Sequence, residues 1–148
     1  MGCDIHTYAE KKTETRYEYI SGLVPFDYRS YGTFGFLADV RNYSDVTPIS
    51  ACRGVPADAS KEVIAEQNQW DCDGHSHSWL SVDELASFDY DQIMEDRRVM
   101  RNNNGGCTCE HGNGKSMTYR EFLGDSFFED IQALKAHGAD RIIFWFDN

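Results

Sequence analysis

Carboxylate and imidazole side chains are concentrated in two short stretches of this chain. The first is MGCDIH at the amino terminus, which contains Asp4 and His6. The second is DCDGHSHSW, residues 71–79, which contains two further histidines. Imidazole and carboxylate groups act as general acids and bases when a bound ligand lies within reach. We therefore take Asp4, His6 and His75 as the candidate catalytic residues, which would orient or attack that ligand.

The same stretches contain side chains that bind divalent metal ions. Asp-x-His at residues 4–6 and Gly-His-x-His at residues 74–77 resemble fragments of the binuclear metallophosphoesterases, although that family's intervening motifs are absent. The resemblance implies a metal-dependent hydrolase in which zinc or manganese activates water against a phosphate ester. The candidate metal ligands are Asp4, His6, Asp73, His75 and His77. The ordinary alternative is that the two histidines flank a strand, one buried and one exposed.

A second group of metal-binding side chains lies in CTCEHG, as Cys107, Cys109 and His111. Structural zinc sites favour two to four residues between paired cysteines, whereas here there is one. The surrounding Asn/Gly-rich stretch at about 102–116 is expected to be a mobile polar loop. Whether these three residues bind metal stays open.

Three arginines lie close to aromatic residues in the sequence. Arginine binds phosphate or carboxylate bidentately, and an aromatic face can stack on a base. Together they favour a pocket for a nucleotide-like or other anionic small molecule. The candidate ligand-binding residues are Arg29, Tyr31, Arg41, Arg53, Ser76 and Trp79. The alternative is that each arginine pairs with one of the abundant Asp and Glu side chains.

Hydrophobic periodicity and capping signals indicate which elements position these residues. Alternation predicts a hairpin of two strands at the amino terminus and a buried final strand. Helices are expected in TFGFLADVRN, from about residue 57 after Pro56, in VDELASF behind a Ser81–Glu84 capping box, and after Thr118, with Gly124 as a weak point. The fold class is α+β, with a small, mainly antiparallel sheet that includes both terminal strands and several helices packed beside it.

The amino-terminal strand has two distinct faces. Cys3 falls on the face with Ile5, which is expected to enter the core, whereas Asp4 and His6 share the other face. If the first and last strands are neighbours, these two side chains approach Trp145 and Asp147.

Length and charge restrict the function further. The 148 residues fit a single domain, 1–148. A net charge of −11 argues against direct DNA or RNA binding. No apolar run reaches the ~20 residues of a membrane span, and no signal peptide is recognisable. We expect a cytoplasmic protein whose five cysteines are reduced thiols or ligands.

MGCDIH, VRN, RGVP, DGHSHSW and FWFDN resemble a group of small phage- and prophage-encoded proteins that begin Met-Gly-Cys-Asp-Ile-His. The chain departs from that group's Arg-Asn-Tyr with Arg29, Ser30 and Tyr31. The resemblance implies a phage origin and a setting in the host-cell cytoplasm, but no established activity.

The leading hypothesis is a phage-type protein that sequesters or cleaves a host signalling nucleotide to counter defence. The alternatives are the metal-dependent hydrolase and a non-catalytic protein that masks a host protein. Whether the chain is an enzyme, and whether it forms a homo-oligomer, stay open.

Overall fold

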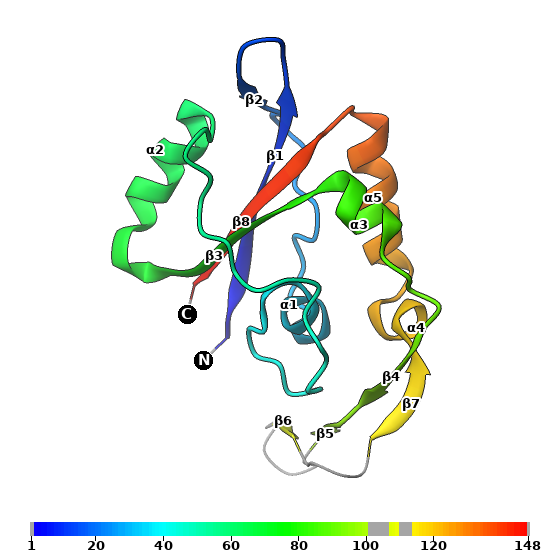
Figure 1. Ribbon diagram of the computed structural model, residues 1–148. Coiled ribbons are helices and arrows are strands. Elements are labelled where there is room, and N and C mark those ends of the chain that lie inside the picture. The colour runs from blue at the N-terminus through cyan, green and yellow to red at the C-terminus, as the bar shows by residue number, and fades with distance from the viewer. Residues whose placement is uncertain (1, 101–106, 110–113, 148) are drawn as a thin grey trace. The chain divides into compact units, whose positions relative to one another are not determined.

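The computed structural model describes residues 2–100, 107–109 and 114–147, and the chain forms two compact units (Figure 1). The first unit contains residues 1–29, 52–88 and 126–148, and the second contains residues 30–51 and 89–125. The expectation of one domain over 1–148 stays a prediction. The expected α+β class is confirmed.

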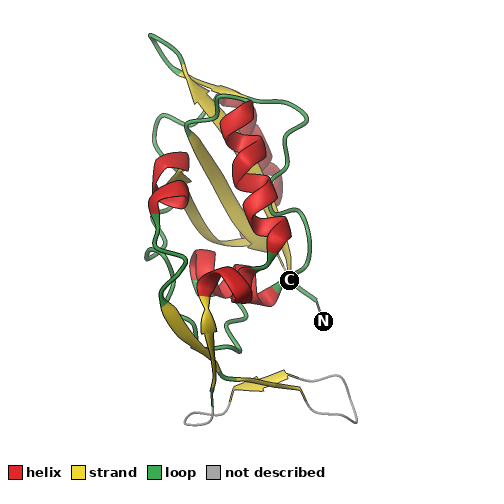
Figure 2. Cartoon of the chain, turned by 90° about the vertical axis from the view of Figure 1, so that its right-hand side faces the viewer, coloured by secondary structure: helices red, strands yellow, loops and turns green. Residues whose placement is uncertain are grey.

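The first unit is built on a four-stranded antiparallel sheet with strand order β2-β1-β8-β3. These strands are β1 (Asp4–Lys12), β2 (Tyr17–Tyr19), β3 (Gly74–Ser81) and β8 (Arg141–Asp147). The terminal strand β8 is internal, in agreement with its continuous apolar sequence. Both chain ends lie at the same end of this sheet (Figure 1 and Figure 2).

Helices lie on both sides of the sheet. They are α2 (Lys61–Trp70), α3 (Val82–Ser87) and α5 (Asp125–Ala136), with a short 3-10 helix η1 (Asp71–Asp73) after α2. Figure 1 shows α2 and α5 on opposite sides. Buried Val63 of α2 packs with Ile143 and Trp145, while buried Phe127 of α5 stacks on Phe26 at 4.8 Å between ring centroids.

The sequence located α3 more accurately than α2. At α3, Ser81 and Glu84 form both bonds of the capping box, which confirms that prediction. The helix expected from about residue 57 begins instead at Lys61. The main-chain N–H of Ser60 donates to the buried carboxylate of Glu10 at 2.7 Å, so a tertiary contact holds the preceding residues out of the helix.

The second unit contains α1 (Tyr31–Ala38) and α4 (Tyr119–Leu123) with two small antiparallel sheets. Its strands are β4 (Ile93–Asp96), β5 (Arg98–Met100), β6 (Cys107–Cys109) and β7 (Lys115–Thr118), paired β4–β7 and β5–β6. Buried Phe36 packs against Tyr90 and Tyr119. The helix expected to reach Arg41 ends at Ala38, because Asp39 adopts a left-handed conformation that closes it.

Two further expectations concern membrane spans and the loop at about 102–116. Among the described helices, none has the length and apolar character needed to cross a membrane. Most of the loop expected at about 102–116 lies outside the described residues, and so do the side chains of the Cys107, Cys109 and His111 set.

Candidate functional site

The pairing of β1 with β8 brings the two chain ends together in one polar cluster. Asp4 is opposite Asp147 and His6 is opposite Trp145, so the expected approach of these side chains is confirmed. His6 Nε2 lies 2.8 Å from Asp147 Oδ2, and each side chain is about one-quarter exposed at 24%. The His6 ring also lies against Trp70, with 4.2 Å between ring centroids. The imidazole is therefore fixed by a carboxylate and by a ring.

Arg29 forms a bidentate ion pair with Asp4 beside this cluster. Its Nε and Nη2 donate to the two carboxylate oxygens of Asp4 at 2.9 Å each. This hydrogen bonding holds the pKa of Asp4 below its ordinary range. Glycine at position 2 leaves room for the guanidinium, because a Cβ there would collide with it.

A hollow of about 290 Å³ opens between the start of β1 and the segment that precedes the second unit. It is lined by Asp4, Ile5, His6, Asp27, Tyr28 and Arg29. A volume near the lower end of the range for ligand pockets suits a small polar molecule. The lining supplies one guanidinium, carboxylates, an imidazole and a tyrosine ring.

Strained backbone conformations occur in both units, and those of the first unit lie near this cluster in the sequence. In the described part of the first unit, three non-glycine residues have left-handed backbone angles: Phe26 (φ 62°), Asp71 (φ 44°) and Ser76 (φ 55°). Such a conformation costs about 1–2 kcal/mol in a non-glycine residue. Phe26 directly precedes the hollow's loop, Asp71 follows Trp70, and Ser76 separates the two central histidines. Strain of this kind is characteristic of functional sites.

Ser76 also decides which way the two histidines of β3 point. A regular strand would place His75 and His77 on one face, but an irregularity in register lies between His75 and Ser78. His75 is opposite Phe146 and stacks on it, whereas His77 packs on Trp145 at 5.5 Å. Because Trp145 and Phe146 point to opposite faces of the sheet, the two imidazoles do so too. Both are half-buried, so the expectation of one buried and one exposed histidine is wrong.

Because His75 and His77 point to opposite faces of the sheet, these two proposed metal ligands cannot bind the same ion. In the part of the chain that the structure describes, no three His, Cys, Asp or Glu side chains are placed to hold a metal ion. Asp73 is exposed in η1. Burial and the neighbouring charge of His75 lower the pKa of His77, which favours its neutral form.

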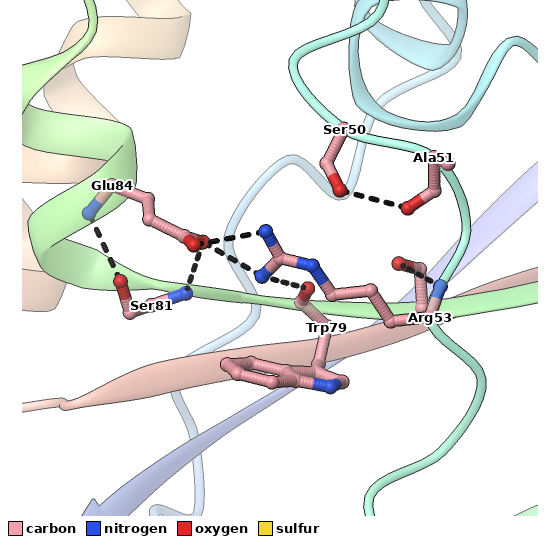
Figure 3. Close-up of polar contacts among 7 residues, drawn as sticks. Ser50, Ala51, Arg53, Trp79, Ser81 and Glu84 are labelled. Carbon is pink, nitrogen blue, oxygen red and sulfur yellow. Dashed lines mark hydrogen bonds and ion pairs between the residues drawn. The ribbon is translucent and has the colours of Figure 1, made fainter.

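Arg53 is held in a network that supports α3 (Figure 3). Its guanidinium donates to both carboxylate oxygens of Glu84, at 2.8 and 2.9 Å, and to the main-chain oxygen of Trp79 at 3.2 Å. The guanidinium also lies 4.8 Å from the centroid of the Trp79 ring. Glu84 is the same residue that caps α3 through Ser81. This is the intramolecular pairing that the sequence left as an alternative, and Arg29 adopts it too.

Two of the predicted ligand-binding residues, Tyr31 and Arg41, belong to the second unit, whereas Ser76 and Trp79 belong to the first. Arg41 lies 5.9 Å from the centroid of the Tyr31 ring and donates to the hydroxyl of Tyr43 at 3.3 Å. They form an aromatic and cationic group of their own within the second unit.

Sequence reasoning missed Trp70, Asp27 and Tyr28 as neighbours of the polar cluster. A signal for Trp70 was present, since it ends a helix directly before DCDGHSHSW. Asp27 and Tyr28 adjoin Arg29, but no periodic pattern marks them.

Comparisons with known proteins do not identify a family. No family model, no curated protein and no solved structure matches this chain. The functional argument therefore depends on the geometry of the chain itself.

Proposed function

We propose that this chain binds a nucleotide-like small molecule with an anionic group in the hollow beside β1. The observation that carries the proposal is the Arg29–Asp4 pair, which lines the hollow while both side chains are about half exposed, at 52% and 51%. Exposed ion pairs contribute little to stability, so a ligand's phosphate can replace Asp4 on the guanidinium at low cost. A guanidinium group can donate two parallel hydrogen bonds to a phosphate or a carboxylate.

The other lining residues supply contacts for the rest of such a ligand. The Tyr28 ring offers an aromatic face, and exposed Asp27 offers a carboxylate that can accept hydrogen bonds from ribose hydroxyls. On the resemblance to phage proteins, the ligand would be a host signalling nucleotide that the protein sequesters in the host-cell cytoplasm.

The fixed orientation of His6 favours a second candidate, cleavage of the bound nucleotide. A histidine held by Asp147 through Nε2 can take a proton from water through Nδ1, and this base requires no metal ion. Water would attack the phosphate ester, its proton would pass to His6, and the ester oxygen would leave with a proton from solvent.

Calorimetric titration tests binding. The ligands are inorganic phosphate and the 5′-monophosphates of adenosine, guanosine, cytidine and uridine. Arg29→Ala should weaken the tightest of these about tenfold or more, because a charged hydrogen-bonded pair is lost. The matched control is Arg16→Ala, which removes an exposed arginine of the same unit from outside the hollow. Equal affinity of the Arg29→Ala variant and the unaltered protein would contradict the proposal.

Phosphorus NMR of the same mixtures tests cleavage. If the second candidate is correct, product forms in the presence of EDTA and its formation is lost in His6→Gln, while binding persists. Product formation that EDTA abolishes would contradict the metal-free base.

A further inference from the structure

The main chain of β1 presents a hydrogen-bond donor and an acceptor at its outer edge. In an antiparallel sheet, successive residues direct their N–H and C=O groups to alternate sides of the strand. The C=O of Glu10 faces β8, where it accepts from Asp140 at 2.9 Å, and the C=O of Ala9 faces the other side, where it accepts from Ile20 at 2.9 Å. By this alternation, Ile5 and Thr7 direct their main-chain groups away from β8.

The pairing strand β2 does not reach these two residues. Its register with β1 covers Glu10, Lys11 and Lys12 alone. Among the residues that the structure describes, none forms a hydrogen bond with the main-chain N–H or C=O of Ile5 on this side. Ile5 is 4% exposed and lines the hollow. Main-chain groups without a protein partner are rare in folded proteins, and these belong to a residue that lines a hollow, so a ligand in the hollow would supply the missing partners.

Of these two residues, Ile5 lines the hollow and Thr7 does not. Next along the edge, the Thr7 hydroxyl donates to the main-chain oxygen of Pro25, which brings the preceding loop against the strand. A peptide that extends the sheet needs several consecutive residues of edge. One N–H and one C=O side by side instead fit a small planar group that offers an acceptor and a donor at adjacent positions.

We propose that the main-chain N–H and C=O of Ile5 bind the hydrogen-bonding edge of a nucleobase. The N–H of Ile5 donates to a ring acceptor, and its C=O accepts from the neighbouring N–H of the base. Arg29 lines the same hollow and takes the ligand's phosphate. This inference rests on the proposed function and specifies its ligand as a base-containing nucleotide.

The first test uses methylated ligands. After the tightest of the four nucleoside monophosphates has been identified, its edge donor is blocked, as in 3-methyluridine, 1-methylguanosine, N6,N6-dimethyladenosine or N4,N4-dimethylcytidine monophosphate. The methylated ligand should bind about tenfold more weakly, as expected for loss of a buried hydrogen bond. Ribose 5-phosphate should be weaker still.

The second test removes the donor from the protein. Proline fits an edge strand where its missing N–H points outward, so Ile5→Pro preserves the ladder with β8. Ile5→Val is the matched control, because it trims the buried side chain and keeps the N–H. Ile5→Pro should weaken nucleotide binding about tenfold, whereas Ile5→Val should not. Methylation should weaken binding to Ile5→Pro as well, because proline keeps the C=O that accepts from the base.

The possible results separate the two proposals. Equal affinity for methylated and unmethylated nucleotides would overturn the role of Ile5 and leave the nucleotide site intact. Absence of binding by all four nucleotides would overturn both. If Ile5→Pro does not fold, the methylated ligands decide the question alone.

Discussion

Each end of the β1–β8 strand pair has an arginine paired with a carboxylate, but one pair is buried and the other is half exposed. At one end, Arg141 Nε donates to Glu10 at 2.7 Å and Nη1 donates to Asp58 at 2.9 Å, while Tyr17 lies over the guanidinium at 3.4 Å. The side chains of Arg141 and Glu10 are 5% and 0% exposed. At the other end, the Arg29–Asp4 pair is half exposed and lies beside an open strand edge.

The two ion pairs differ most in their exposure to solvent. A hollow of about 420 Å³ lies at the Arg141 end as well, so volume does not separate the two ends. Arg141 is held by two acidic residues and a ring and cannot exchange a partner cheaply. Under the proposed function, Arg29 exchanges Asp4 for a ligand anion. We assign stability to the first end and binding to the second.

Arg141→Met should produce the largest loss of stability. It leaves the carboxylate of Glu10 buried without its charged partner, which costs about 3–5 kcal/mol. Chemical denaturation measures the change. The control is the double variant Glu10→Met with Arg141→Met, which should recover much of the loss. If the free energy of unfolding of the single variant falls by less than about 1 kcal/mol, the Arg141 pair is no more stabilising than an exposed pair, which would contradict the comparison.

Arg53→Ala should have an intermediate effect. Its side chain and that of Glu84 are 29% and 39% exposed, between the values at the two ends of the sheet. Loss of this pair and of the contact with Trp79 should reduce stability by about 1 kcal/mol. Nucleotide affinity should not change. Reduced nucleotide affinity in this variant would show that Arg53 contributes to binding, as the sequence predicted.

His77 should contribute a smaller, pH-dependent effect. Its pKa is lowered by burial and by His75, so the unfolded chain takes up this proton at a higher pH than the folded protein does. The stability it contributes is therefore present above the unfolded pKa of about 6.5 and is lost as the pH falls below it. His77→Gln should flatten the decline in stability between about pH 7 and pH 5. The exposed His137→Gln serves as control, and an unchanged slope in His77→Gln would refute the assignment.

Arg29→Ala should have the smallest effect on folding and the largest on binding. The thermal midpoint should stay within experimental error, because the ion pair it removes is exposed to solvent. Affinity for the nucleotide should fall as described above. A variant that unfolds readily would give Arg29 the structural role assigned to Arg141.

The two faces of β1 and the α3 cap were predictable because local patterns encode them, whereas the pairing of β1 with β8 entered as a condition that the structure fulfils. Alternation identified the strand faces, and Ser81 with Glu84 identified the helix start. The start of α2 was not predictable, since Glu10, fifty residues away, captures the N–H of Ser60. The carboxylate with which each arginine pairs likewise depends on tertiary contacts, which local sequence patterns do not reveal.

The orientation of the histidines was beyond sequence reasoning for another reason. Ser76 adopts a left-handed conformation that sequence patterns assign to glycine or asparagine, so no signal marked the irregularity between His75 and Ser78. The open edge at Ile5 became visible once the register of β1 with both neighbours was known.

The most direct test is a ¹H–¹⁵N NMR titration with the tightest-binding nucleoside monophosphate. It follows the main-chain amide of Ile5 and the side-chain Nε–H groups of Arg29 and Arg141. Our account predicts that the Ile5 and Arg29 signals shift together and saturably while the Arg141 signal stays in place. Shifts confined to Arg141 and its neighbours, or no shift at all, would contradict it.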